Sequence, residues 1–223
     1  MAQITVDYVN HMGDDNTVVD AARVSFDKKS DLYTEEQNNK LIKYLAKHKH
    51  ISPFGHCFAS FKAKAPIFVA RQLVKHRFLR WNEISRRYVD DEPEFYVPDA
   101  WRGRSADKKQ GSSDTTLEFL RMQGFGEQSI NDGSFKHQMH SLDLYRDMLT
   151  AGVAPEQARM VLPQSTMTEW YWSGSLDAFA SMCQLRCKPD TQYESRLVAD
   201  QISEKMGELF PVSWSALMNE GEK

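Results

Sequence analysis

Alternation of apolar and polar residues in "HCFASFKAK", residues 56–64, is the feature that most constrains the fold. In an extended chain, one face of this stretch would carry the side chains of Cys57, Ala59, Phe61 and Ala63. The pattern therefore predicts a half-buried β-strand. Pro66 follows directly, and proline is favoured at the first position of a helix. We expect a strand that leads straight into a helix over residues 66–78.

Capping residues and prolines predict the other elements. Strands are expected at 3–9 and 164–172. The expected helices begin at Asn16 or Thr17, at the Thr34–Gln37 capping box, at Asp114 or Thr115, at Ser134, at Pro155, at Ser175 and at Asp190. Their expected ends are the cationic run 47–50, Gly152, Pro163 and Leu209. Loops are expected at 51–56 and at the polar, Gly/Ser-containing stretch 99–113.

Helices outnumber strands in this prediction, and we find no repeat and no boundary between two domains. The expected fold class is therefore α+β: a small, twisted, mainly antiparallel sheet packed with helices, in one domain over residues 1–223.

The formal net charge of −3 argues against a surface built for polyanions. Three cysteines form a poor disulfide framework and favour a reducing compartment, so a cytoplasmic location is expected. The sequence shows no signal peptide and no apolar run long enough to span a membrane. Cys183 and Cys187 lie one helical turn apart without further zinc ligands, and His137 and His140 are expected on a solvated helix face.

Against this background, positive charge concentrates in "QLVKHRFLRWNEISRRY", residues 72–88. The stretch surrounds a single acid, Glu83, with Lys75, His76, Arg77, Arg80, Arg86 and Arg87. One interpretation is a solvated helix end. The other is a site for an organic phosphate, because guanidinium groups bind phosphate with paired hydrogen bonds. Neither a dinucleotide-binding glycine motif nor a P-loop is present elsewhere.

The motif "KHRFLRWNEIS" resembles the R-H-R-x7-S signature of flavin-dependent thymidylate synthases, with Lys75, His76, Arg77 and Ser85 at its fixed positions. Further stretches look like blocks of the same family in the same order: "AARVSF" (21–26), "KHKHISPFGH" (47–56), "KAPIFVARQ" (64–72), "NEISRRY" (82–88), "EFYVP" (94–98), "ARMVLP" (158–163) and "LRCKPDTQYE" (185–194).

This resemblance implies synthesis of dTMP from dUMP. 5,10-Methylenetetrahydrofolate would be the carbon donor, and FAD reduced by NADPH the hydride source, with no cysteine nucleophile. It also implies a homotetramer whose active sites combine residues of neighbouring subunits. A partner nucleic acid or membrane is not expected.

The resemblance assigns roles to residues in the matching blocks. The implied FAD contacts are His50, Ser52, Lys75, His76, Arg77 and Glu83. The implied dUMP contacts are Gln72, Lys75, Glu83, Ile84, Ser85, Arg86, Arg87, Arg159 and Arg186. Arg186 is the implied catalytic residue, because a guanidinium beside the uracil would favour loss of its N3 proton.

Ser85 is open to two interpretations, a phosphate ligand or a nucleophile. A hydroxyl nucleophile needs an adjacent base, and the sequence shows none. We therefore expect Ser85 to bind phosphate and Ser85→Ala to keep measurable turnover.

The chain departs from the family pattern at several points. Lys75 stands where arginine is usual, and Gly55 where many members carry an acid. Residues 173–184 lack the asparagines and arginine that often contact the flavin adenine portion, so we assign no flavin ligand there. No role is expected for the loop 99–113.

Two rival functions remain open. One is a single-strand nucleic-acid binder that stacks bases on Phe78, Trp81 and Tyr88. The other is a nucleotide-binding homologue without catalytic activity.

Overall fold

The computed structural model describes residues 2–89, 91–106, 111–122 and 126–219. Its strands are β1 (Thr5–Met12), β2 (Phe58–Pro66), β3 (Leu79–Glu83), β4 (Trp101–Arg104), β5 (Ser112–Leu117), β6 (Phe119–Met122), β7 (Gly126–Ser129) and β8 (Met167–Ser175). Its α-helices are α1 (Asp15–Arg23), α2 (Glu35–Lys47), α3 (Ile67–Leu73), α4 (Ile130–Thr150), α5 (Pro155–Ala158), α6 (Leu176–Arg186), α7 (Tyr193–Leu209) and α8 (Pro211–Asn219).

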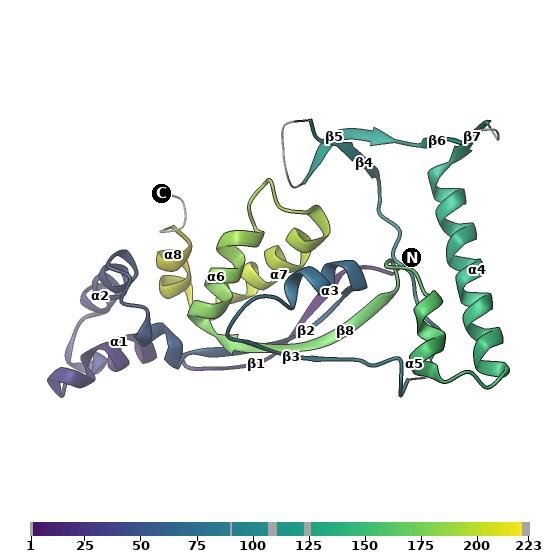
Figure 1. Cartoon of the computed structure of the whole chain (residues 1–223). Helices are drawn as coiled ribbons and strands as arrows, with labels where there is room; N and C mark the ends of the chain where they lie inside the picture. Colours follow the sequence, from purple (N-terminus) through teal and green to yellow (C-terminus); the bar gives the residue numbers. More distant parts are fainter. Residues whose placement is uncertain (1, 90, 107–110, 123–125, 220–223) are drawn as a thin grey trace.

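The central sheet has the strand order β1-β2-β8-β3, and all of its pairings are antiparallel. Helices α3, α6 and α7 cover one face of it (Figure 1). The predicted α+β fold class is therefore confirmed. No helix within the described ranges is both long and apolar enough to cross a membrane.

Strand β2 confirms the alternation seen in the sequence. Ala59, Phe61 and Ala63 are buried toward the helices, whereas Lys62 pairs with Glu169 at 2.7 Å on the outer face. The expected strand at 164–172 begins and ends three residues later, as β8, which pairs with β2 along its whole length. Helices α3 and α7 pack against β2, and helix α6 packs against β8.

Aromatic rings fill the space between sheet and helices. Phe179 of α6 packs edge-on against Phe61 at 5.3 Å and against Trp172 at 5.7 Å between ring centroids. Trp170 stacks on Trp81 of β3 at 4.4 Å, which ties the edge strand to the core. These contacts fix the position of the segment that contains the signature motif.

A second part of the molecule, which we call the arm, extends from the right-hand end of the sheet in Figure 1. It contains the two-stranded ladders β4–β5 and β6–β7 and the long helix α4. The predicted helix at Asp114 or Thr115 is wrong, because these residues belong to β5. The predicted loop 99–113 is partly wrong as well, because it contains β4 and the start of β5. Pairing between the two strands overrides the turn-forming composition of the stretch.

Helix boundaries were predicted with mixed success. The Thr34 capping box is present, as is the end of α7 at Leu209. Helix α1 is capped by Asp14, helix α4 by Ser129 and helix α7 by Gln192, which corrects the predicted starts. Ser175 occupies the N-cap of α6 as predicted, although its side chain makes no capping hydrogen bond. Helix α8 was not predicted.

Gly152 follows helix α4 with a φ of +85°, as a helix-ending glycine should. Pro155 begins α5 as predicted, but the α-helix ends at Ala158 and a short 3₁₀ helix (Arg159–Val161) precedes Pro163.

Candidate active site

The signature motif, residues 75–85, spans the turn after α3, strand β3 and the two residues that follow it. Helix α3 ends at Leu73, so the predicted helix over 66–78 is too long. Phe78 adopts a left-handed backbone conformation with a φ of +65°, an uncommon state for a bulky residue. This turn reverses the chain so that β3 can pair with β8. The backbone strain is therefore stored within the motif, as is common at functional sites.

Gly174 of β8 allows the turn to approach the sheet. A Cβ atom at this position would lie 2.3 Å from Leu79 Cδ2 and 3.3 Å from the Phe78 carbonyl oxygen. A larger residue would therefore push β3 and the preceding turn away from β8.

A cavity of about 600 Å³ opens between this turn and helix α6. We call it the signature cavity; its lining residues are Ile51, Lys75, His76, Arg77, Phe78, Asp177, Ala178, Ala180, Ser181, Gln184, Leu185, Arg186 and Leu217. The structure thus brings the consecutive predicted site residues Lys75, His76 and Arg77 together with Arg186, which lies 110 positions after His76.

His76 and Arg186 contact each other directly in this cavity. The Arg186 Nε donates a hydrogen bond to His76 Nε2 at 2.9 Å. Burial, and secondarily the charge of Arg186, lower the pKa of His76 to about 4. The imidazole is therefore neutral at pH 7, with its proton on Nδ1.

Asp177 supplies the cavity with a carboxylate. Its Oδ1 atom is buried and has no hydrogen-bond partner among the described residues. The position of Asp177 in the first turn of α6 favours a negative charge, but does not satisfy this oxygen. An unpartnered acceptor is costly unless a ligand donates to it.

The last residue of β3, Glu83, and the residues that follow it form a separate group. Glu83 accepts hydrogen bonds from Thr168 Oγ1 at 2.7 Å and from Trp81 Nε1 at 3.2 Å. Within the described ranges its hydrogen-bond partners are these two uncharged groups, and its implied contacts with FAD and dUMP stay predictions.

Ser85 and Arg87 form a small unit beside Glu83. Ser85 Oγ accepts from the backbone N of Arg87 at 3.4 Å and from its Nε at 3.1 Å. These bonds leave the nitrogens Nη1 and Nη2 of Arg87 for a ligand. A guanidinium has no lone pair for a proton, so it does not serve Ser85 as a base.

The predicted dUMP residues fall at both ends of β3. Lys75 precedes the strand, whereas Ser85 follows it, and Leu79–Glu83 alone spans about 13 Å of extended chain. Arg159 directly follows α5 in the chain. Helix α5 lies near the end of the sheet where β8 begins (Figure 1). Its Nε donates to the Glu156 carbonyl at 3.2 Å. One chain therefore does not gather the whole predicted set around one phosphate.

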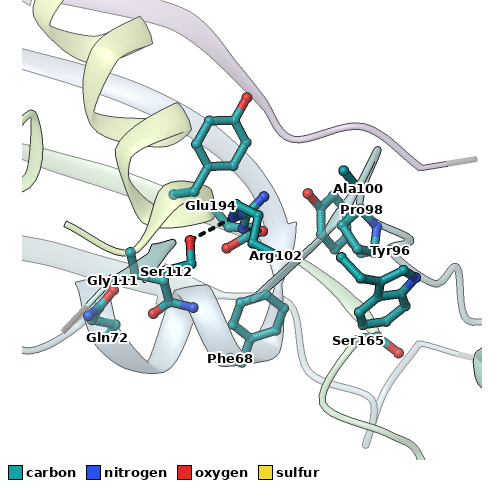
Figure 2. A pocket seen from close by; sticks show the side chains of 13 residues that line it. Phe68, Gln72, Tyr96, Pro98, Ala100, Arg102, Gly111, Ser112, Ser165 and Glu194 are labelled. Carbon is teal, nitrogen blue, oxygen red and sulfur yellow. Dashed lines mark hydrogen bonds and ion pairs between the residues drawn. The ribbon is translucent and has the colours of Figure 1, made fainter. Parts of the chain in front are cut away.

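Gln72 faces another space. A cavity of about 580 Å³, which we call the arm cavity, is lined by Phe68, Gln72, Tyr96, Pro98, Ala100, Trp101, Arg102, Gly111, Ser112, Ser165, Gln192, Tyr193 and Glu194 (Figure 2). Gln72 Oε1 accepts a hydrogen bond from Ser195. The side chain is thus already held by helix α7.

The charged side chains that line the arm cavity are paired with other residues of the same cavity. Arg102 forms an ion pair with the buried Glu194 and donates from its Nε to Ser112 Oγ at 2.9 Å (Figure 2). Its guanidinium carbon also lies 4.4 Å from the Tyr193 ring centroid. Burial raises the pKa of Tyr96 to about 12. The walls are therefore aromatic and contain no unpaired ion among these groups.

Sequence reasoning missed several of these residues. Asp177 lies where no ligand was assigned, and Arg102 belongs to the loop without an expected role. The first-turn position of Asp177 was the available signal, but it indicated only helix capping. Conversely, His50 and Ser52 are exposed and do not line the signature cavity, although their neighbour Ile51 does.

The thiols are poorly suited to nucleophilic attack. Burial, assisted by the negative charges of Asp14 and Asp15, raises the pKa of Cys57 to about 12. Cys183 is fully buried, and burial raises its pKa also. All three cysteines are free, and no cluster of metal-binding side chains occurs in the described part of the chain.

Comparison with known proteins places this fold and site in a class of nucleotide-modifying enzymes. The family model described as "Thymidylate synthase complementing protein" matches residues 7–212. A flavin-dependent thymidylate synthase from Thermus thermophilus is 40% identical over 213 residues, covering 93% of this chain and 73% of the relative. The enzyme of the same name from Thermosipho africanus is 37% identical, covering 94% and 89%.

Solved structures agree with this result. The UMP/dUMP methylase PolB from Streptomyces cacaoi, bound with 5-Br dUMP, superposes with a TM-score of 0.83 at 32% identity, covering 99% of this chain and 97% of that one. Its complex with 5-Br UMP gives a TM-score of 0.80. The chain belongs to the flavin-dependent thymidylate synthase family, which confirms the resemblance seen in the sequence.

Proposed function

We propose that this protein methylates dUMP to dTMP. Reduced FAD supplies the hydride, 5,10-methylenetetrahydrofolate supplies the one-carbon unit, and NADPH reduces the flavin. The observation that carries the proposal is the meeting of the signature cations Lys75 and Arg77 with Arg186 in one cavity. Family membership and the dUMP-analogue complex of PolB support the same reaction.

The signature cavity fits a flavin nucleotide. Its volume of about 600 Å³ accommodates a large ligand, and Lys75 and Arg77 can neutralise a diphosphate. The unpartnered Oδ1 of Asp177 can accept a hydrogen bond from a nucleotide hydroxyl or amine. FAD bound here supplies two-electron redox chemistry that no side chain offers.

Arg186 stabilises negative charge on the pyrimidine. Burial lowers the pKa of its guanidinium, but the group stays protonated at neutral pH. A fixed cation beside the uracil favours loss of the N3 proton and the build-up of electron density at C5, which must bond to the incoming carbon. A preorganised cation in a partly dry cavity is more effective than one in water.

Neither a thiol nor Ser85 acts as the nucleophile in this proposal. Cys57 and Cys183 are buried and hold their protons tightly. Ser85 is paired with Arg87 and has no base partner among the described residues. We assign Ser85 and Arg87 to the dUMP phosphate.

We further propose a homotetramer with shared active sites. The two groups of predicted dUMP ligands lie at opposite ends of β3, so a neighbouring subunit would bring Ser85, Arg87 and Arg159 to the signature cavity of the first. Mixing Arg186→Ala with Arg87→Ala subunits tests this directly. Mixed assemblies should regain activity at sites that contain neither substitution, whereas sites contained in one chain would regain none.

The nucleic-acid rival receives less support from the geometry. Trp81 is packed against Trp170 and bonded to Glu83, so its ring faces are not free for bases. Phe78 and Tyr88 are exposed, but they flank β3 at opposite ends. A continuous stacking platform is therefore absent from this group of three.

An anaerobic single-turnover assay tests the proposed function. Reduced, FAD-loaded protein is mixed with 5,10-methylenetetrahydrofolate and dUMP, and thymidylate is measured; UMP replaces dUMP in a parallel reaction. We expect dTMP with stoichiometric flavin oxidation. A yellow protein that forms no methylated product would favour the inactive homologue, and a colourless protein that binds oligonucleotides would favour the nucleic-acid binder.

A further inference from the structure

The side chain of Arg186 is long, so its orientation in the signature cavity depends on the groups that contact it. Arg186 ends helix α6, and His76 lies 110 positions earlier in the turn after α3. The backbone N of His76 donates to the Leu73 carbonyl at 3.1 Å, which fixes the turn that carries the ring. The imidazole is therefore carried by a hydrogen-bonded turn, and its Nε2 accepts from the guanidinium at the end of helix α6.

The direction of this hydrogen bond is fixed by the chemistry of the two groups. A guanidinium donates and does not accept, so His76 Nε2 must present its lone pair to Arg186 Nε. This hydrogen bond uses the one N–H on the stem side of the guanidinium. The Nη1 and Nη2 groups, which offer the paired donors suited to a uracil carbonyl and an ionised N3, remain free of it.

We propose that His76 is a positioning residue for Arg186. It holds the guanidinium plane in the orientation that meets the pyrimidine, and it does so as a neutral acceptor. This role differs from the flavin contact implied by the family resemblance, and it rests on the proposed function because Arg186 is its target. A preorganised arginine loses less side-chain freedom on binding and is correctly aimed when charge develops.

Two substitutions separate this role from simple packing. His76→Phe fills the same space without an acceptor, so Arg186 loses its hydrogen bond. His76→Gln places an amide oxygen near the former Nε2 and keeps the acceptor. His137→Phe, on an exposed position of α4, is the matched control for adding a phenyl ring.

The readouts are kcat and KM for dUMP, bound flavin per protein, and dUMP binding by calorimetry. For His76→Phe we expect kcat to fall about 30-fold, dUMP to bind at least fivefold more weakly, and flavin content to match the wild type. His76→Gln should recover both values to within about threefold, and His137→Phe should leave them unchanged. Circular dichroism and the melting temperature verify that each variant is folded.

Two results would overturn the proposal. Equal losses in the Phe and Gln variants would mean that the acceptor is irrelevant. Loss of flavin in parallel with activity would return His76 to the flavin contacts. If the wild type makes no thymidylate, the proposed function fails, but the calorimetric comparison still decides whether an acceptor at residue 76 supports pyrimidine binding.

Discussion

The signature cavity and the arm cavity are similar in volume and share no lining residue, and their charges are arranged in opposite ways. In the arm cavity Arg102 has an ion pair, a hydroxyl partner and an aromatic ring. In the signature cavity Lys75 and Arg77 line the space with no ion pair among the described residues, and Asp177 keeps an unpartnered oxygen.

This difference distinguishes charged groups that stabilise the fold from charged groups that are available to a ligand. A buried ion with partners on several sides stabilises the native structure only as long as all partners remain. The exposed cations Lys75 and Arg77 are solvated and available to a ligand, whereas the buried Asp177 Oδ1 without a partner costs stability that a ligand donor would recover. By this criterion we propose the signature cavity as the ligand site. The arm cavity mainly connects the arm to helix α7.

Arg186→Ala should have the largest effect on this comparison. We expect kcat to fall roughly 100- to 1,000-fold, the usual effect of removing a fixed charge-stabilising donor. Flavin content should stay near the wild-type value, because the proposed partner of Arg186 is the uracil. Stopped-flow turnover and the flavin-to-protein absorbance ratio measure the two effects, with the exposed Arg104→Ala as the control. An equal loss of bound flavin would contradict the assignment.

Arg102→Met should instead act on stability. Removing one member of a buried ion pair leaves Glu194 uncompensated, which costs about 3 kcal/mol of unfolding free energy. The double variant Arg102→Met/Glu194→Leu should regain most of that loss. Urea denaturation of the single and double variants measures both values. If the single variant were as stable as the wild type but inactive, the arm cavity would be a ligand site after all.

Substitutions of Asp177 should have a smaller effect, on FAD affinity, and they distinguish the loss of a hydrogen-bond acceptor from the loss of charge. Asp177→Ala should weaken FAD binding about tenfold, equivalent to about 1.4 kcal/mol, because an acceptor is lost. Asp177→Asn keeps the oxygen and should bind FAD within about threefold of the wild type. Fluorescence titration of the apoprotein provides the affinities. Tighter binding by both variants would show that the carboxylate merely repels the diphosphate.

The remaining prediction is a pH dependence of stability through His76. Its pKa of about 4 in the folded state lies below the ordinary value of 6.5, so the unfolded chain binds the proton more readily between these values. The contribution of His76 to stability is therefore present above pH 6.5 and is lost as the pH falls toward 4. Of the charged groups that line the same cavity, Arg186 is the one that lowers the pKa of His76; Lys75, Arg77 and Asp177 also line it.

Melting temperatures between pH 7 and pH 4 test this sign. The wild type should lose more stability than His76→Gln over the interval from pH 6.5 to pH 4, since glutamine does not titrate. Parallel curves for the two proteins would show that His76 does not titrate abnormally in the folded state.

The sequence was most informative where a local pattern had one physical solution. The alternation around Phe61 could be buried in only one way, and the Thr34 capping box satisfies its own helix end. The sequence was least informative where pairing between strands that are far apart in the chain determines the secondary structure. Residues 74–78 were predicted to continue the helix but form a turn, and residues 79–83, for which no strand was predicted, form an edge strand paired with β8. The single-domain assignment over residues 1–223 stays a prediction.

The site divides in the same manner. The local concentration of positive charge drew attention to the segment that contains Lys75, His76 and Arg77, whereas Arg186 was assigned only through the family resemblance. What the sequence alone does not contain is which of them meet. The contact between His76 and Arg186, the free oxygen of Asp177 and the separation of Ser85 from Lys75 come from antiparallel pairing and helix packing, which join residues by distance in space and not by order along the chain.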